Sequence, residues 1–360
     1  MQPKLLRILI SPLDWGLGHA TRCIPIIWQL LKSGHKITLA GNGRSLVLLE
    51  KEFPLLETIE LQGFSPSYPK SGKMLLHLLL LLPKFIFSIL REHQQLSNVL
   101  STNSFDVIIS DNRYGLFNKK IRSVIITHQV MIKLPNWLKI AEYPIYVVSR
   151  FMISRFNECW IPDTLGIPGL SGDLSHKYTL PRNACFVGPL TRFSGSGYFE
   201  TNCSGEIRIT AIISGPEPQR SLFEELITKQ LSDLNLTSTI LSGRPDFGKT
   251  VDSVGCLTII SHLETHELEQ IIAVSTLVIC RSGYSSIMDL AAMGSKALFV
   301  PTPGQTEQIY LAELHQQLGI ALWRPQDKLN LKIDIPEALK YSGYSRKSAM
   351  PDHTITIPGF

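Results

Sequence analysis

The chain has 360 residues, a length typical of two domains. Hydrophobic residues make up 44 % of it and charged residues 18 %, a composition that excludes an intrinsically disordered protein. The net charge of +5 is uneven, because residues 1–200 hold 22 basic and 13 acidic residues and residues 201–360 hold 13 and 17. A basic first half attracts anionic partners such as lipid head groups or phosphates; an ordinary solvated basic face is the alternative.

The six cysteines are scattered, with no Cys-x-x-Cys pair and no zinc-ligand spacing. This pattern predicts reduced thiols in a cytoplasmic protein, and the N-terminal residues lack a signal-peptide cleavage site. The basic residues are dispersed and no nucleic-acid-binding motif accompanies them, so we expect no nucleic acid partner.

The first half alternates apolar strands with helical patterns. RILISP (7–12) predicts a buried parallel strand, IPIIWQLLKSG (24–34) a helix and KITLAG (36–41) a second strand. FDVIISD (105–111) and SVIITHQ (123–129) repeat the strand pattern, with polar residues at their carboxyl ends. Ligands bind at the carboxyl ends of strands in open α/β sheets, so these ends are candidate site positions.

A second alternation follows a stretch rich in Gly and Ser. Strands are predicted at the start of the second half, at 238–243, 257–263, 276–283 and 297–303, with helical segments between them. The fold class expected is α/β, with two Rossmann-like domains facing a cleft. We predict an N-terminal domain at 1–193, a linker at 194–206, a C-terminal domain at 207–330 and a tail at 331–360.

The most apolar stretch is MLLHLLLLLPKFIFSIL (74–90), which is interrupted by His77, Pro83 and Lys84. It is shorter than the roughly 20 apolar residues that a membrane-spanning helix needs. Two interpretations remain: helices packed within the first domain, or an apolar patch flanked by basic residues that contacts a membrane surface. The second predicts a peripheral protein at the inner face of the cell membrane.

Three loops contain candidate catalytic or ligand-binding residues, and each loop follows a predicted strand. The first, GLGHAT (16–21), lacks the third glycine of a dinucleotide fingerprint, which argues against NAD. Histidine is a common general base at neutral pH, so His19 in this loop is a candidate for removing a proton from an acceptor hydroxyl. The alternative is a structural or exposed histidine.

The other two loops lie in the second half. CRSGYSSIMD (280–289) offers backbone N–H groups and hydroxyls at a helix N-terminus, which suit a diphosphate, and the carboxylate of Asp289 suits ribose hydroxyls. PTPGQTEQ (301–308) presents amides and a carboxylate, the groups that bind sugar hydroxyls. A solvated helix residue and an ordinary capping loop are the alternatives. No Asp-x-Asp triplet occurs, so we expect no metal.

The segment VICRSGYSSIMDLAAMGSKALFVPTPGQTEQ (278–308) resembles the donor-binding signature of MurG-like glycosyltransferases, the family that includes the N-acetylglucosaminyltransferase of peptidoglycan synthesis. GLGHATRCIPIIWQL (16–30) and FVGPLTR (186–192) are similar to its glycine-rich N-terminal loop and its interdomain segment. The resemblance implies a GT-B fold and inverting transfer of a hexose or N-acetylhexosamine from a UDP-sugar, with no cofactor besides that donor.

The resemblance also implies residue roles. His19 would be the catalytic base, with Asp111 and His128 near the acceptor. Asp289 would hold the ribose and Gln308 the donor sugar. The complete set implied for the donor is Gly18, Arg192, Ser214, Gly215, Leu263 (against the uracil), Arg281, Ser282, Gly283, Asp289, Gln305 and Gln308.

Two departures from the family pattern concern the phosphate loop and the acceptor. The family's Gly-Gly-Ser-x-Gly loop is replaced by Ser-Gly-Pro-Glu-Pro at 214–218, and its His-Glu-Gln-Asn stretch by Thr-His-Gln-Val at 127–130. We therefore expect a different acceptor, a lipid-linked or envelope glycan. The alternatives are a UDP-N-acetylglucosamine 2-epimerase-like isomerase and a non-catalytic sugar-nucleotide-binding protein.

Overall fold

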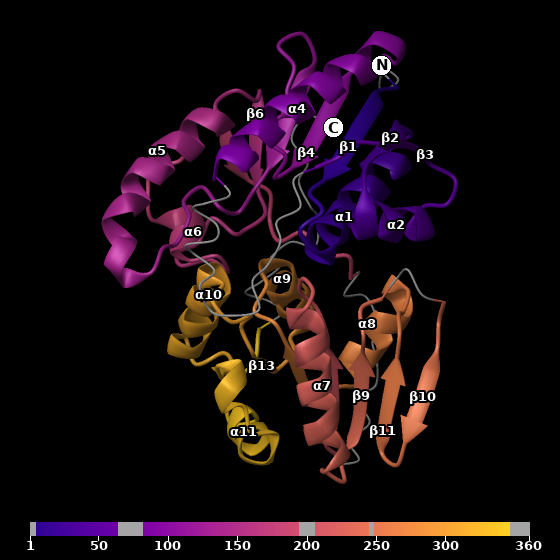
Figure 1. Cartoon of the computed structure of the whole chain (residues 1–360), viewed down its shortest axis with the longest axis vertical. Coiled ribbons are helices and arrows are strands. Elements are labelled where there is room, and N and C mark those ends of the chain that lie inside the picture. The colour runs from indigo at the N-terminus through magenta and orange to yellow at the C-terminus, as the bar shows by residue number, and fades with distance from the viewer. Residues whose placement is uncertain (1–4, 64–81, 194–205, 245–247, 346–360) are drawn as a thin grey trace. The chain divides into compact units, whose positions relative to one another are not determined.

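The computed structural model describes residues 5–63, 82–193, 206–244 and 248–345. The chain forms two compact units that divide between Leu190 and Thr191, here called the N-terminal and the C-terminal unit (Figure 1). The predicted linker lies outside the described residues except for Glu206.

The described part of the N-terminal unit is a seven-stranded parallel sheet in the order β3-β2-β1-β4-β5-β6-β7. Its strands are β1 (Arg7–Pro12), β2 (Lys36–Gly41), β3 (Glu57–Glu60), β4 (Val107–Asp111), β5 (Arg122–Ile126), β6 (Glu158–Ile161) and β7 (Ala184–Phe186). Its helices are α1 (Leu17–Lys32), α2 (Gly43–Glu52), α4 (Leu82–Thr102), the 3₁₀ helix η1 (Asn136–Ala141), α5 (Glu142–Ile153) and α6 (Asp173–His176).

The strand order reverses next to β1, and this positions the first candidate site. The chain leaves β1 toward β2 and later returns to β4 on the other side of β1. Such a switch point opens a crevice at the carboxyl ends of the two strands, where ligands bind in doubly wound folds. The His19 loop follows β1, and β4 ends at Asp111.

The C-terminal unit repeats this plan in the order β10-β11-β9-β8-β12-β13-β14, parallel except for the antiparallel β10–β11 pair. Its strands are β8 (Arg208–Ile212), β9 (Thr237–Leu241), β10 (Val251–Val254), β11 (Leu257–Ile260), β12 (Leu277–Cys280), β13 (Ala297–Phe299) and β14 (Leu322–Trp323). Its helices are α7 (Gln219–Ser232), α8 (Thr265–Ala273), α9 (Tyr284–Met293), α10 (Thr306–Gln317), the 3₁₀ helix η2 (Gln326–Lys328) and α11 (Leu331–Ala338). The prediction of two Rossmann-like α/β domains is confirmed.

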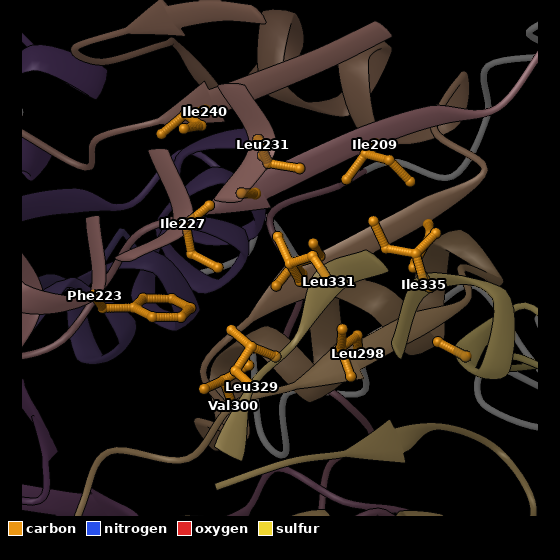
Figure 2. Packing of buried hydrophobic residues seen from close by; sticks show 14 of the residues in the cluster. Ile209, Phe223, Ile227, Leu231, Ile240, Leu298, Val300, Leu329, Leu331 and Ile335 are labelled. Atoms are coloured by element: carbon orange, nitrogen blue, oxygen red, sulfur yellow. The ribbon is translucent and has the colours of Figure 1, made fainter. Parts of the chain in front are cut away.

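The core of the C-terminal unit extends beyond the predicted domain end at residue 330. Phe223, Ile227 and Leu231 recur at helical spacing along α7 and are buried in one cluster, where Leu331 and Ile335 of α11 join them (Figure 2). Residues 331–338 therefore belong to the second unit rather than to a tail, because α11 covers part of its apolar core.

The apolar stretch 74–90 falls partly outside the described residues. Its last part, residues 82–90, begins α4, which leaves Ile86, Phe87 and Leu90 exposed. Within the described chain, no helix combines the length and the apolar character needed to cross a membrane.

Candidate functional site

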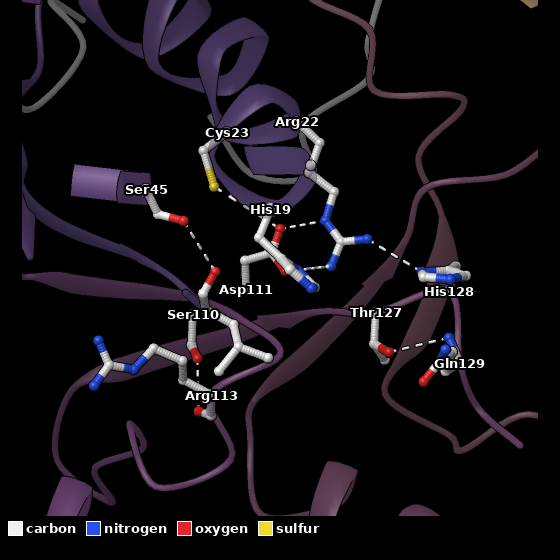
Figure 3. Close-up of polar contacts among 12 residues, drawn as sticks. His19, Arg22, Cys23, Ser45, Ser110, Asp111, Arg113, Thr127, His128 and Gln129 are labelled. Atoms are coloured by element: carbon white, nitrogen blue, oxygen red, sulfur yellow. Dashed lines mark hydrogen bonds and ion pairs between the residues drawn. The ribbon is translucent and has the colours of Figure 1, made fainter. Parts of the chain in front are cut away.

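The three predicted catalytic residues meet at the switch point of the N-terminal unit. His19 lies in the first turn of α1, and its Nδ1 is 2.8 Å from Oδ1 of Asp111 at the end of β4 (Figure 3). Arg22, one turn further along α1, donates to both carboxylate oxygens of Asp111. The same guanidinium lies 3.1 Å from Nδ1 of His128, in the loop after β5. Arg22 is thus the centre of the cluster.

The charge balance of this cluster keeps Asp111 ionised. Complete burial raises the pKa of the Asp111 carboxyl, but the charges of Arg22 and His19 and their hydrogen bonds outweigh it. The pKa of Asp111 consequently lies below its usual range. A carboxylate that is both bidentate with arginine and bonded to an imidazole is a fixed negative charge that orients the ring.

Nδ1 has a different hydrogen-bonding role in each of the two histidines. Arginine can only donate, so Nδ1 of His128 accepts from Arg22 and the neutral His128 carries its proton on Nε2. Nδ1 of His19 lies 2.8 Å from Asp111 and 2.9 Å from Nη2 of Arg22, so it accepts from Arg22 when it is unprotonated and donates to the Asp111 carboxylate when it is protonated. This tautomer leaves Nε2 of His19 as the basic nitrogen. The half-buried His19 therefore has the arrangement of a general base, and His128 orients Arg22.

Asn112 adds a conformational constraint next to Asp111. Its φ of 54° lies in the left-handed region, which asparagine tolerates better than most residues. Its backbone N–H donates to the Ile126 carbonyl, while its buried Oδ1 has no hydrogen-bond partner. Local strain of this kind is common at functional sites, and here it ends β4 at the carboxylate.

In the C-terminal unit, the predicted donor residues gather at the equivalent edge of the sheet. Ser214 and Gly215 follow β8, Ser282 and Gly283 follow β12, and Gln305 and Gln308 follow β13. Carboxyl ends of parallel strands meet at one edge, so these loops are neighbours. Leu263 follows β11 and is buried. Gly18 instead lies beside His19 in the N-terminal unit.

Asp289 is held by the segment that opens the C-terminal unit. Its Oδ1 accepts from Oγ1 of Thr191 at 2.8 Å, and its Oδ2 is 3.6 Å from Nε of Arg192. Burial raises the pKa of Asp289, and the nearby Arg192 charge and the Thr191 hydrogen bond only partly offset this. The structure thus brings Asp289 and Arg192 together, as expected of two residues on one donor, and adds Thr191.

Hydrogen bonds of Ser282 and Gln308 connect the two loops predicted to bind the donor, 280–289 and 301–308. The Ser282 hydroxyl donates to the Gln308 carbonyl at 2.7 Å, and the Gln308 amide oxygen accepts from the backbone N–H of Thr302 at 2.8 Å. These groups were predicted to bind diphosphate and sugar, but here the Ser282 hydroxyl and the Gln308 amide oxygen have partners within the protein. The backbone of Gly283 at the start of α9 is different, because a Cβ there would meet open space.

Two further loops come together at Gly215 and Thr302. Gly215 has a φ of +109°, which residues with a side chain rarely adopt, and a Cβ there would lie 3.7 Å from Oγ1 of Thr302. That hydroxyl is buried and has no hydrogen-bond partner among the residues that the structure describes, and neither has the buried Oε1 of Gln305 on the same loop. Unpartnered buried polar groups cost free energy, so this edge suits a polar ligand.

The resemblance placed Arg281 among the donor-binding residues, but its side chain is turned away from the strand ends. Its buried guanidinium stacks 4.0 Å from the ring centre of Phe223 and donates to three backbone carbonyls and to Gln326. Burial lowers the pKa of Arg281 to about 9. The side chain points into the unit and joins α7, β13 and η2, so its role is structural.

Sequence reasoning missed three residues at these sites: Arg22, Thr191 and Thr302. Arg22 follows His19 at the i, i+3 spacing that places two side chains on one helix face. Thr191 and Thr302 each lie within motifs already singled out, but the role of a single buried hydroxyl leaves no periodic signal. Among the described residues, no group of three or more His, Cys, Asp or Glu could hold a metal ion.

Comparison with known proteins agrees with this geometry. Residues 218–345 match the model of the glycosyltransferase family 28 C-terminal domain. An uncharacterised glycosyltransferase of Methanosarcina acetivorans is 24 % identical over 345 residues, covering 87 % of this chain and 84 % of that protein. A second one, from Methanosarcina mazei, is 22 % identical and covers 87 % and 84 %.

Solved structures give the same fold at low identity. The spinosyn rhamnosyltransferase SpnG superimposes with a TM-score of 0.65 at 15 % identity, covering 96 % of this chain and 95 % of that one. The calicheamicin glycosyltransferase CalG4 gives 0.63 at 14 %, covering 97 % and 93 %. Arabidopsis thaliana UGT89C1 in complex with UDP-L-rhamnose gives 0.58 at 15 %, covering 94 % and 92 %.

This chain is a glycosyltransferase with the GT-B fold. The family match and the names of the relatives confirm that prediction. They do not extend to the donor sugar, the acceptor or the MurG-like specificity.

Proposed function

We propose that this glycosyltransferase is an inverting, metal-independent enzyme that transfers a hexose or N-acetylhexosamine from a UDP-sugar to a hydroxyl of a lipid-linked or envelope glycan. Nε2 of His19 removes the acceptor proton while the acceptor oxygen bonds to the anomeric carbon. The bond from that carbon to the diphosphate breaks, and UDP leaves. Attack opposite the leaving group inverts the configuration.

The observation that carries the proposal is the His19–Asp111 pair at the switch point. Asp111 remains negative because Arg22 lowers its pKa, so it can stabilise the imidazolium that forms when His19 takes a proton. Arg22 places a second positive charge 2.9 Å from the ring, which opposes that protonation.

The donor proposal rests on the loops of the C-terminal unit. The backbone at Gly283 and the N-terminus of α9 suit a diphosphate, since helix N-termini carry partial positive charge. The hydroxyl of Thr302 beside Gly215 adds a donor on the loop after β13. Asp289 suits the ribose and Arg192 the developing charge, while Leu263 and Gln308 keep their proposed contacts to uracil and sugar.

The acceptor proposal rests on the sequence of the N-terminal unit. The basic excess of residues 1–200 suits an anionic, lipid-linked substrate, and the altered loop after β5 carries the His128 that fixes Arg22. We therefore propose a cytoplasmic enzyme at the inner face of the membrane, with residues 74–90 in contact with lipid.

A calorimetric titration with UDP, UDP-glucose and UDP-N-acetylglucosamine, with and without EDTA, tests the donor site. We expect binding that EDTA does not change and that Asp289→Asn weakens by about tenfold or more. Thr191→Val is the matched control, because it breaks the same internal hydrogen bond but keeps the carboxylate. If both variants weaken binding equally, Asp289 acts only through its neighbours. If none of the nucleotides binds, the donor proposal is wrong.

The base is tested by the release of UDP from bound UDP-sugar, to water or to added membrane lipid extract. His19→Asn should lower the rate by about 10²–10⁴-fold and leave UDP affinity unchanged. His266→Asn is the control, because this exposed histidine of α8 contacts only Gln270 among its hydrogen-bond partners in the described structure. Donor binding without turnover in the unmodified protein would favour a non-catalytic sugar-nucleotide-binding protein.

A further inference from the structure

The outer face of η1 and α5 is apolar. These two helices follow each other along one side of the N-terminal unit (Figure 1). The large side chains exposed there are those of Trp137, Ile140, Tyr143, Val147, Val148 and Phe151, which we call the apolar stripe. Trp137 is 73 % exposed and Ile140 89 %.

The stripe is not the packing face of the helix. Tyr146 and Ile153 of α5 point inward and are buried in the core with Val130 and Phe156. A surface helix normally turns polar side chains outward, but α5 is apolar on both faces. A contiguous exposed apolar surface of this kind marks an interaction site.

The exposed charges of the segment that carries the stripe are all positive. Glu142 is the one acidic residue between positions 132 and 157, and it is buried, where it accepts from the Leu134 N–H and from Nζ of Lys177. Lys139, Arg150 and Arg155 are exposed. Residues 132–157 therefore combine exposed apolar side chains with positive charge and have no exposed acidic residue.

This combination identifies the partner by its chemistry. A symmetric contact with a second copy would set these cations against the same cations. A lipid bilayer with anionic head groups offers negative charge above an apolar layer, and the amphipathic rings of Trp137 and Tyr143 suit the boundary between them. We infer that the apolar stripe is the surface by which the N-terminal unit binds an anionic membrane.

This surface is distinct from the stretch 74–90, and its binding needs neither donor nor acceptor. A single amphipathic surface of a few side chains gives weak, reversible binding that salt reduces. The contact would concentrate the enzyme where a lipid-linked acceptor lies, but the lipid contact holds whether or not that acceptor is the substrate.

The test is cosedimentation of the full chain with vesicles, either of phosphatidylcholine alone or of equal parts phosphatidylcholine and phosphatidylglycerol. We expect binding to the mixed vesicles only, weakened by added salt. Ile140→Glu should lower the vesicle affinity about tenfold or more, and Lys139→Gln about fivefold. Leu55→Glu is the matched control, because Leu55 is 96 % exposed in the same unit and the change in size and charge is the same. Its affinity should remain that of the unmodified chain.

Three outcomes would overturn the inference. The first is equal vesicle binding by Ile140→Glu and Leu55→Glu. The second is loss of binding in Phe87→Glu with full binding in Ile140→Glu, which would assign the contact to α4. The third is a dimer in solution that Ile140→Glu dissociates, without vesicle binding. UDP titration of each variant separates this test from the proposed function, because the stripe lies outside both candidate sites.

Discussion

The two candidate sites are built around two buried carboxylates whose environments differ. Asp111 faces a guanidinium that binds both its oxygens, and its pKa is lowered. Asp289 has one hydroxyl partner and a guanidinium at 3.6 Å, and burial raises its pKa. The first carboxylate is a charge fixed within the protein. The second is undercompensated, which suits a group that accepts hydrogen bonds from a ligand.

The surrounding polar atoms follow the same division. In the N-terminal cluster, Arg22 donates to Asp111 and to His128, and its guanidinium lies 2.9 Å from Nδ1 of His19. At the C-terminal edge, buried oxygens of Thr302 and Gln305 have no hydrogen-bond partner in the described structure. Enzymes preorganise their catalytic groups, whereas a binding edge keeps donors and acceptors for its ligand. This difference supports the proposal that the N-terminal unit carries the catalytic base and the C-terminal unit binds the donor.

The largest expected effect is that of removing the charge at the centre of the N-terminal cluster. Arg22→Met leaves the buried Asp111 without its partner, and breaking a buried pair in this way costs about 3–5 kcal/mol. Urea unfolding should show this loss in the free energy of unfolding of the N-terminal unit. The double variant Arg22→Met/Asp111→Asn should recover part of it, because no buried charge remains. A loss below about 1 kcal/mol would contradict the buried pair.

The next effect concerns the backbone of the C-terminal edge. Gly215→Ala forces a side chain into a φ of +109°, which costs about 1–3 kcal/mol, and places its Cβ beside Thr302. We expect UDP affinity to fall about tenfold by calorimetry as the loop shifts. Gly319→Ala is the control, since its φ of +71° is also positive and a Cβ there meets open space. Equal loss of UDP affinity in both would attribute the effect to general strain.

The pH dependence of stability should have opposite signs at the two carboxylates. The lowered pKa of Asp111 means that its ionised form stabilises the fold above the unfolded pKa, and that this contribution is lost as pH falls through the folded pKa. The raised pKa of Asp289 means that its neutral form stabilises the fold at acid pH, and that this contribution is lost as pH rises through the folded pKa.

Asparagine variants measure those two contributions. At neutral pH, Asp111→Asn should lower the free energy of unfolding and Asp289→Asn should raise it, the latter by on the order of 1 kcal/mol. On acidification, the Asp289→Asn difference should shrink first, as the pH falls through the raised folded pKa, and the Asp111→Asn difference should shrink only below the usual aspartate pKa of about 4. Urea midpoints at a series of pH values provide the measurement. A change of the same sign in both variants would show that the two carboxylates do not differ as described.

Much of this architecture was predictable from the sequence, because buried parallel strands are continuous apolar runs such as RILISP and LVIC. Candidate site positions followed from the rule that ligands bind at strand ends: His19 lies in the first turn of the helix after β1, Asp111 ends β4 and Ser282 follows β12. Side-chain partners were not predictable. Arg281 and Ser282 adjoin in one motif, yet one points into the core and the other braces a loop.

The end of the C-terminal domain was also not predictable from the sequence. Residues 331–338 (LKIDIPEA) are too few to show a clear helical period and contain Pro336, so their helix is recognisable only when Leu331 and Ile335 are seen against α7. Tertiary packing decides such short segments, since isolated helices of that length are unstable in water.

The smallest effect tests the unpartnered hydroxyl directly. Thr302→Val removes Oγ1 and keeps the shape of the side chain. Because that hydroxyl has no hydrogen-bond partner in the described structure, the free energy of unfolding should stay the same or rise by less than about 1 kcal/mol, while UDP affinity falls several-fold. The two readouts therefore move in opposite directions, as a ligand-binding group requires.

Thr210→Val provides the contrast within the same unit. The Thr210 hydroxyl is buried too, but it lies 2.6 Å from the Ser275 hydroxyl, so its removal should lower the free energy of unfolding by about 1 kcal/mol and leave UDP affinity unchanged. If Thr302→Val behaves like Thr210→Val, the hydroxyl at the edge serves only the fold. The contrast between a catalytic cluster whose polar atoms are hydrogen-bonded and a binding edge with unpartnered oxygens would then be wrong for Thr302.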